Sequence, residues 1–341
     1  MTYRNKYVDL LKGLAMILVI IPHCIQYGSG YTYLNECMFY DNPIFKFIYS
    51  FHMPVFMLIS GYLFKYSIIK HSFSTLIKNR ITTLIIPIFI WHSLYIIIKY
   101  FIFGDGTLNN FYYSSYLKCL WFLWAVFWNS IIILLVHKFA KDSILIYFLL
   151  FIISLFIPHI FNSNYYIFMY PYFFCGYYLN GFSNLYINKL VKISFSPYSI
   201  IIISIIFILM LTMYSRDDYV YVSGTNIIKS GRISFKMINT NLFRWSIGFI
   251  GSFLFYAISM NYYNQKRNND IIYFFEKIGT RTLGIYIISD YSFRFFYLLP
   301  IESLNYFIIT IEIICITCAS YIFTWLIEKN HFTRKLLLGG R

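Results

Sequence analysis

The chain has 341 residues, of which 59% are apolar, 23% aromatic and 12% charged. Soluble domains contain about 25% charged residues and about half apolar residues, so this composition excludes an ordinary soluble fold. The formal net charge of +15 is compatible with nucleic-acid binding only if the basic residues line one solvated face.

Apolar runs of about 20 residues, the length of helix that crosses a bilayer, recur along the whole chain. Ten such spans use roughly 200 residues, which leaves no room for a second folded domain. We therefore predict an all-α polytopic membrane protein with ten transmembrane helices in one bundle, forming a single membrane-embedded domain over residues 1–341. In chain order the predicted spans are 8–27, 44–64, 81–103, 117–136, 143–158, 165–182, 197–214, 243–263, 278–298 and 304–327.

Lysine and arginine are distributed unevenly between the connections of these spans. If the N-terminus is cytoplasmic, most of the 28 Lys and Arg residues fall in segments on the cytoplasmic side, and much of the remainder lies in or beside one long outer loop, 215–242. Short cytoplasmic loops of membrane proteins retain Lys and Arg. The pattern predicts that both termini are cytoplasmic and that the charge reflects topology, so no nucleic-acid partner is expected.

Two further patterns limit the function classes. The first span is followed by Pro22, His23 and Cys24 without a small-residue cleavage site, so it is predicted to remain as a helix and not to be a removed signal peptide. Cys315 and Cys318 are closely spaced inside the tenth span but lack a second ligand pair, which favours packing over a zinc or redox role. The sequence contains no Walker loop, dinucleotide fingerprint or His-Glu-x-x-His motif, and no metal is expected.

Ionisable side chains inside the spans are the candidates for function, because they are costly in lipid and usually face the bundle interior. They are Asp9, Lys12, His23, Lys46, His52, His92, Asp290, Arg294 and Glu312.

The first span carries three of these residues. Eleven residues at about 100° each place Lys12 and His23 within about 20° of one line along the helix, and Asp9 lies within about 60° of it. The alternative is an interfacial Asp9–Lys12 pair with His23 hydrogen-bonded to a neighbouring helix. The alignment of these three residues on one helix face favours a functional role. Apolar side chains at the same positions would cost less free energy inside the membrane. A buried imidazole is expected to be neutral, with one nitrogen able to take a proton or attack a carbon.

The other intramembrane groups are less informative. His52 lies at a depth comparable to that of His23 and is a second candidate for the same site, although a helix-to-helix hydrogen bond would also account for it. Asp290 and Arg294 have i, i+4 spacing, which predicts an intrahelical ion pair. For His92 and Glu312 we predict only structural roles.

Two segments resemble the acyltransferase family 3 membrane proteins. Residues 4–23, RNKYVDLLKGLAMILVIIPH, are similar to the opening helix of that family, and residues 51–64, FHMPVFMLISGYLF, are similar to its Phe-His-Met-Pro run that ends in Ser-Gly-Tyr. Weaker similarity follows in family order at 80–87 (RITTLIIP), 120–123 (LWFL) and 278–286 (IGTRTLGIY).

The resemblance implies a membrane-bound O-acyltransferase of the inner (plasma) membrane. Such an enzyme transfers an acyl group, usually acetyl from cytoplasmic acetyl-CoA, to a hydroxyl of an extracytoplasmic polysaccharide or lipid-linked sugar precursor. Similar members include fucose 4-O-acetylase-like and exopolysaccharide O-acetyltransferase proteins. The family's catalytic histidine corresponds to His23, and its earlier arginine is Lys12 here. The chain also has Thr83 where a second basic residue is common and Ser289 and Asp290 where many members have histidine. No fused extracellular domain is expected.

The resemblance and the residues together predict the site. His23 acts as base or acyl carrier, with Lys12 and His52 as further catalytic residues, and Arg80, Lys12 and Arg281 hold the CoA phosphates. Ser60 and Trp121 are candidates for substrate contacts and, with His52, for oxyanion donors. The alternative function is a transporter or flippase of a polysaccharide intermediate without acylation. A transporter of this kind is expected to have helices that are interrupted at corresponding positions in two repeated halves of the chain. The prolines of this sequence do not occur at corresponding positions in two halves.

Overall fold

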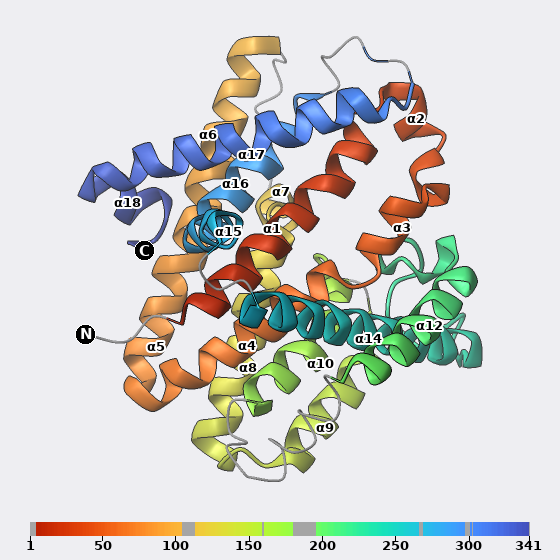
Figure 1. Cartoon of the computed structure of the whole chain (residues 1–341). Helices are drawn as coiled ribbons and strands as arrows, with labels where there is room; N and C mark the ends of the chain where they lie inside the picture. The colour runs from red at the N-terminus through yellow and green to blue at the C-terminus, as the bar shows by residue number, and fades with distance from the viewer. Residues whose placement is uncertain are drawn as a thin grey trace. The chain divides into compact units, whose positions relative to one another are not determined.

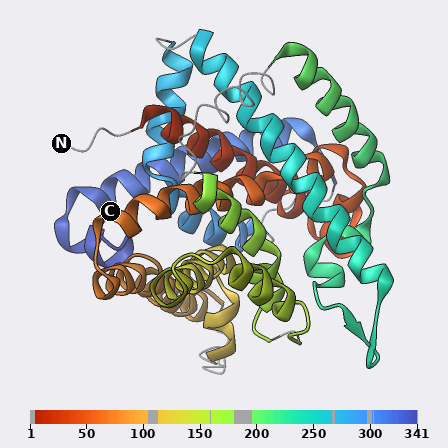
Figure 2. The ribbon, with the colours of Figure 1, turned by 90° about the horizontal axis from the view of Figure 1, so that it is seen from below.

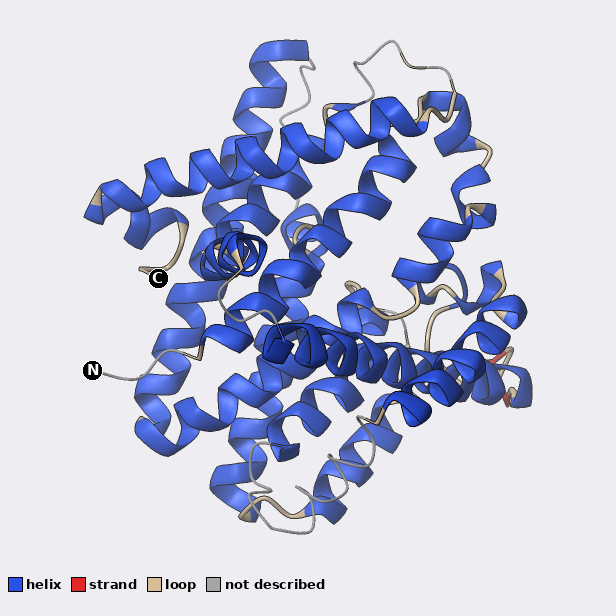
Figure 3. Cartoon of the chain, in the orientation of Figure 1, coloured by secondary structure: helices blue, strands red, loops and turns tan. Residues whose placement is uncertain are grey.

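The computed structural model describes residues 5–103, 113–158, 160–179, 196–265, 269–296, 301 and 303–340. Nearly all of this part of the chain is helical, and its strands form one short hairpin (Figure 3). The prediction of an all-α membrane protein is therefore confirmed in its class.

Six helices in the described residues are long and apolar enough to cross a membrane. They coincide with the first four, the eighth and the tenth predicted spans, so the protein is a multi-pass membrane protein. Their bounds are Lys6–Tyr27, Pro43–Lys70, Phe73–Phe101, Trp121–Ala140, Phe235–Gln265 and Tyr306–Lys329.

The other four predicted spans correspond to shorter helices. The fifth is an 11-residue helix, about 17 Å long, whereas the apolar layer of a bilayer is about 30 Å thick. The sixth and seventh are helices of 17 residues, and the ninth is interrupted at Arg281. Residues 180–195 and 266–268, which connect several of these helices, lie outside the described residues. The count of ten spans and the cytoplasmic termini therefore stay predictions.

The chain divides into two compact units. The first comprises Met1–Ile59, Phe182–Arg216 and Arg244–Leu326, and the second comprises Ser60–Gly181, Asp217–Phe243 and Ile327–Arg341. Four elements contribute residues to both, namely α4 (His52–Lys70), η4 (Arg216–Asp218), α14 (Phe235–Gln265) and α17 (Tyr306–Lys329). Each unit is described by itself.

The first unit contains the helix that carries Lys12 and His23. Its elements are α1 (Lys6–Tyr27), α2 (Tyr31–Asn35), η1 (Met38–Asp41), α3 (Pro43–Tyr49), the start of α4 (His52–Lys70), α12 (Pro197–Met213), the start of η4 (Arg216–Asp218), most of α14 (Phe235–Gln265), α15 (Asp270–Thr280), α16 (Thr282–Phe293) and most of α17 (Tyr306–Lys329).

Asn5 caps the start of helix α1: its side chain accepts hydrogen bonds from the backbone N–H groups of Tyr7 and Val8. Helix α15 crosses α1 at a pair of glycines (Figure 1). A Cβ atom on Gly13 would meet the backbone of Phe275, and one on Gly279 would meet the backbone of Asp9. Small residues allow such close helix crossings in membrane proteins. The two glycines therefore position α1, which carries Lys12 and His23.

The second unit contains the remaining elements. They are the rest of α4, α5 (Phe73–Arg80), η2 (Ile81–Ile85), α6 (Ile86–Phe103), α7 (Tyr113–Lys118), α8 (Trp121–Ala140), α9 (Ile144–Ser154), α10 (Ser163–Leu179), α13 (Val220–Ser223), β1 (Ile228–Lys229), β2 (Arg232–Ile233) and α18 (His331–Leu337).

The strands β1 and β2 pair antiparallel, with Ile228 opposite Ile233 and Lys229 opposite Arg232. They form a small hairpin at the edge of the view in Figure 2. Helices α4 and α10 approach closely at Gly61, because a Cβ atom there would meet the backbone of Phe173. The glycine of the Ser-Gly-Tyr motif thus has a packing role in this unit.

Candidate active site

The tautomer of His23 follows from its position in α1. Pro22, directly before it, lacks an N–H group and removes one hydrogen bond of the helix. Nδ1 of His23 lies 2.7 Å from the carbonyl oxygen of Val19. A carbonyl oxygen only accepts, so Nδ1 carries the proton and Nε2 of the neutral ring keeps its lone pair. In the described part of the chain no hydrogen bond to Nε2 is present. This nitrogen has the electron pair that a base or nucleophile needs.

Aromatic rings from two other helices surround His23. The Phe293 ring of α16 stacks on the imidazole with centroids 5.1 Å apart, and the Tyr49 ring of α3 lies at 6.5 Å. Tyr27, one turn further along α1, lies at 6.2 Å. The imidazole is partly exposed and faces neighbouring helices of its own unit.

His52 belongs to the same unit and shares a neighbour with His23. It is the first residue of α4, it is buried, and its Nδ1 lies 3.0 Å from the carbonyl oxygen of Ile48. By the same reasoning, Nδ1 is protonated and Nε2 keeps its lone pair. The Tyr49 ring lies 4.9 Å from the His52 ring and 6.5 Å from the His23 ring. The structure thus brings together the two histidines that the sequence analysis considered for one site.

An acidic and a basic group lie at the end of α16, the helix whose Phe293 ring stacks on His23. Arg294 donates two hydrogen bonds to the Oδ2 atom of Asp290, at 3.0 and 3.2 Å, which is the predicted intrahelical ion pair. Asp290 also interacts electrostatically with His23 and with the hydroxyl of Tyr27. The carboxylate is therefore placed to stabilise a positive charge that develops on the imidazole.

The cations assigned to CoA in this unit lie near the α1–α15 crossing. Nζ of Lys12 lies 2.7 Å from Oδ1 of Asp9, so the ion pair that we considered as an alternative role is present. Arg281, two residues after Gly279, donates a 2.6 Å hydrogen bond to the hydroxyl of Tyr321. His23 lies eleven residues further along α1 than Lys12, or about 16 Å.

Arg80 belongs to the second unit, at the junction of α5 and the π-helical segment η2. Pro87 has no N–H for the carbonyl of Thr83, which loosens the helix at this point. Thr83 donates a 2.6 Å hydrogen bond to the carbonyl oxygen of Asn79. The Arg80 guanidinium carbon lies 4.3 Å from the centroid of the Phe64 ring. Wider helical turns of this kind are frequent at functional sites, and the sequence analysis did not predict this one.

Ser60 and Trp121 also belong to the second unit. The Trp121 ring lies 4.7 Å from that of Tyr165, and Leu120 before it has a left-handed backbone with φ of 45°. Because Arg80, Ser60 and Trp121 are in a different unit from His23, their cooperation with it stays a prediction. His92 forms a 3.0 Å hydrogen bond with Ser115, which agrees with a structural role.

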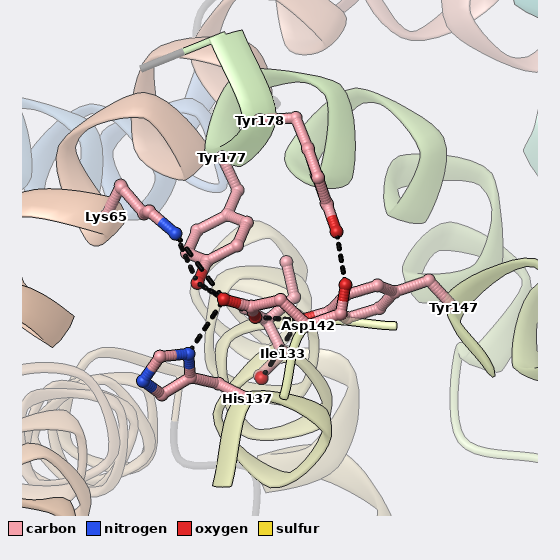
Figure 4. A network of polar contacts seen from close by, with 7 residues as sticks. All are labelled: Lys65, Ile133, His137, Asp142, Tyr147, Tyr177 and Tyr178. Atoms are coloured by element: carbon pink, nitrogen blue, oxygen red, sulfur yellow. Dashed lines mark hydrogen bonds and ion pairs between the residues drawn. The ribbon is translucent and has the colours of Figure 1, made fainter. Parts of the chain in front are cut away.

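The sequence analysis missed a polar network around Asp142, in the turn between α8 and α9 (Figure 4). Oδ2 of Asp142 lies 2.8 Å from Nδ1 of His137 and 3.5 Å from Nζ of Lys65. The hydroxyls of Tyr147 and Tyr177 contact the carboxylate at 2.9 and 3.1 Å. Four helices are therefore tied to one carboxylate. No spacing in the sequence indicates this, because the five residues come together only through packing.

Replacing Asp142 by alanine should destabilise the protein by about 2–3 kcal/mol. The Tyr177 hydroxyl loses its acceptor, the Tyr147 hydroxyl keeps only its 3.3 Å bond to the carbonyl oxygen of Ile133, and alanine is strained at the left-handed φ of 60°. Thermal unfolding in detergent measures the change. The matched control is Asp217→Ala, which removes an ion pair whose side chains are exposed and should change the melting temperature much less, because solvent screens such pairs. Equal destabilisation by the two variants would contradict the assignment.

The same carboxylate should make stability depend on pH. Burial raises the pKa of Asp142, but hydrogen bonds from His137 and Tyr147 and the charges of His137 and Lys65 outweigh this and leave the pKa below its usual value. A carboxylate with a lowered pKa stabilises the fold above the unfolded-state pKa of about 4, and this contribution is lost as the pH falls through the folded-state value. As the pH is lowered from about 6 to 3, the melting temperature of the wild type should fall. The melting temperature of Asp142→Asn should fall less over the same range.

These features define a class: a multi-pass helical membrane protein with a histidine between helices and a lysine further along the same helix face. Residues 5–329 match the acyltransferase domain family, and the chain belongs to that family. The prediction that this is an enzyme of the acyltransferase class is confirmed at the level of the family.

The chain is similar to two curated proteins, each named nodulation protein NolL. The chain is 39% identical over 127 residues to the protein of Sinorhizobium fredii (strain NBRC 101917 / NGR234), which covers 36% of this chain and 34% of that one. It is 35% identical over 145 residues to the protein of Mesorhizobium japonicum (strain LMG 29417 / CECT 9101 / MAFF 303099), which covers 41% and 38%. The match spans little more than a third of the length of these relatives. No solved structure matches the chain.

Proposed function

We propose that the protein transfers an acetyl group from cytoplasmic acetyl-CoA to a hydroxyl of an extracytoplasmic polysaccharide or lipid-linked sugar, in the inner (plasma) membrane. Membership of the acyltransferase family supports acyl transfer. The observation that carries the proposal is His23: its Nδ1 is bound to a backbone carbonyl, and its Nε2 keeps a lone pair between helices.

Two chemical routes use this nitrogen. As a base, Nε2 takes the proton of the sugar hydroxyl while the hydroxyl oxygen attacks the thioester carbonyl carbon. The carbon–sulfur bond then breaks, and the imidazolium returns the proton to the CoA thiolate. As a carrier, Nε2 attacks the same carbon and the thiolate leaves. The sugar hydroxyl then attacks the acetyl-imidazolium, its proton passes to the CoA thiolate, and the neutral imidazole is released. Asp290, which interacts electrostatically with the ring, would stabilise the positive imidazole in both routes.

A quenched reaction separates the routes. Protein is mixed with acetyl-CoA labelled in the acetyl group, without acceptor, and denatured within one turnover. Label attached to His23 supports the carrier route, whereas protein without label that still transfers to acceptor supports the base route.

The cations of the first unit are proposed to hold the CoA phosphates. Arg281→Ala should raise the KM for acetyl-CoA about tenfold, because a charge-assisted hydrogen bond contributes about 1.5–3 kcal/mol, and should leave the KM for the acceptor unchanged. Steady-state kinetics measures both constants.

Tyr321→Phe is the control for that experiment. It removes the hydrogen-bond partner of Arg281 but keeps the charge. If Arg281 only supports the fold, the two variants should behave alike, and this result would contradict a role in binding phosphate.

Inverted membrane vesicles that enclose an acceptor glycan distinguish the enzyme from the transporter. Labelled acetyl-CoA is added outside, where it reaches the cytoplasmic face. Label on the glycan that depends on the protein supports the acyltransferase. Movement of glycan across the membrane without label supports a transporter or flippase and contradicts the proposal.

A further inference from the structure

Glu312 is a buried carboxylic acid that the proposed mechanism does not use. It lies in the first half of α17 and is 8% exposed. Within the described residues, neither of its carboxyl oxygens has a hydrogen-bond partner. Buried carboxyl groups without donors are costly, so each one in a native protein needs an explanation.

The Glu312 carboxyl lies against the end of α1 that is nearer to His23. A Cβ atom on Gly28 would meet Oε2 of Glu312, and the carboxyl interacts electrostatically with Cys24, the residue after His23. Figure 1 shows α17 crossing this end of α1. In the predicted topology this is the outer, extracytoplasmic end of the helix. Gly28 is five residues and Cys24 one residue beyond His23, so the carboxyl lies within about one and a half helical turns of His23 along the axis of α1 and about 100–140° around it. In the predicted topology both groups are on the acceptor side.

A second polar group in this region also lacks a partner. Ser29, next to Gly28, is fully buried, and within the described residues its hydroxyl has no hydrogen bond. The C-terminal end of α1 carries a partial negative charge, which makes an unpaired carboxylate there more costly still. Both features call for a ligand that brings hydrogen-bond donors.

The chemistry of the site favours a polyol over a metal ion. The described residues contain no group of three His, Cys, Asp or Glu side chains able to hold a metal, and hard cations need several oxygen ligands. Neighbouring hydroxyls of a sugar, in contrast, can donate to both oxygens of one carboxylate and can also bond to a serine hydroxyl.

We propose that Glu312 and Ser29 form a subsite for sugar hydroxyls, which holds the acceptor while another of its hydroxyls reacts at His23. This subsite rests on the proposed function and assigns part of its acceptor site. Glu312 is here a binding residue with no part in the chemistry.

The test uses methyl fucoside as acceptor probe and labelled acetyl-CoA as donor. Glu312→Gln should raise the KM for methyl fucoside at least tenfold and leave the KM for acetyl-CoA within twofold. Ser29→Ala should raise the KM for the fucoside several-fold without lowering the melting temperature, because its hydroxyl forms no bond within the described chain. Glu36→Gln, the same substitution at an exposed position of the outer loop, is the control and should change neither constant.

Equilibrium dialysis of radiolabelled methyl fucoside, without acetyl-CoA, tests the subsite independently of transfer. Binding to the wild type that weakens at least tenfold in Glu312→Gln supports the subsite even if no acetyl group is transferred, in which case the proposed function alone fails. Equal binding by the two proteins, or no binding to the wild type, overturns the subsite. A parallel rise of both KM values also overturns it. If Glu312→Gln does not fold, Ser29→Ala and Glu312→Asp are judged by the same criteria.

Discussion

Replacing His23 by alanine is expected to lower the rate of acetyl transfer by at least about 10²–10⁴-fold, the range contributed by a positioned general base. If His23 carries the acetyl group, the loss should be larger, because no other group in the variant would form the intermediate. The measurement is transfer of label from acetyl-CoA to glycan by purified protein in vesicles, with expression and melting temperature determined in parallel.

His71→Ala is the matched control for this experiment, because His71 is exposed at the end of α4. It should keep wild-type activity. His23→Gln tests whether packing alone explains a loss, since it retains a polar side chain of similar reach. A folded His23→Ala variant with more than a tenth of wild-type activity would disprove both chemical routes.

Replacing Gly279 by valine is expected to be the most damaging substitution for the fold. The added side chain would enter the backbone of Asp9 at the crossing of α15 and α1, and forced overpacking typically costs about 1–3 kcal/mol and sometimes more. The variant should lose at least about 3 kcal/mol of stability and, because α1 carries Lys12 and His23, most activity with it. Thermal unfolding in detergent and size-exclusion chromatography measure the effect.

A graded series makes this test specific. Gly279→Ala should be less damaging than Gly279→Val, whereas Thr280→Val, at the exposed neighbouring position, should change the melting temperature little. If Gly279→Val and Thr280→Val had the same melting temperature, the close helix crossing would not contribute to stability.

The parts of the fold that were predictable depend on nearby residues. Apolar runs of about 20 residues identified all six of the long apolar helices in the described residues, because hydropathy and helix length are local properties. The break at Arg281 and the π-helical turn at Ile81–Ile85 were not predicted. Both irregularities depend on how each helix packs against its neighbours and on which backbone carbonyls lack a hydrogen-bond donor, as the carbonyl of Thr83 does because Pro87 has no N–H.

The candidate site was partly predictable for the same reason. Lys12 and His23 share a face of one helix, which the 3.6-residue period shows directly. The Phe293 and Tyr49 rings beside His23 and the carboxylate of Glu312 beside Gly28 come from other helices. Glu312 was predicted to be structural, because nothing in its neighbouring residues indicates that its carboxyl lacks a donor.

The amino-acid sequence alone therefore determined the membrane class, the family and the histidine around which the function is proposed. Each of these follows from residues close together in the chain, where composition and helical spacing set the outcome. Only the tertiary structure decided which rings surround His23, how the Asp142 network forms, and that the carboxyl of Glu312 is buried without a donor. These depend on contacts between residues up to almost 300 positions apart, and packing between helices selects such contacts.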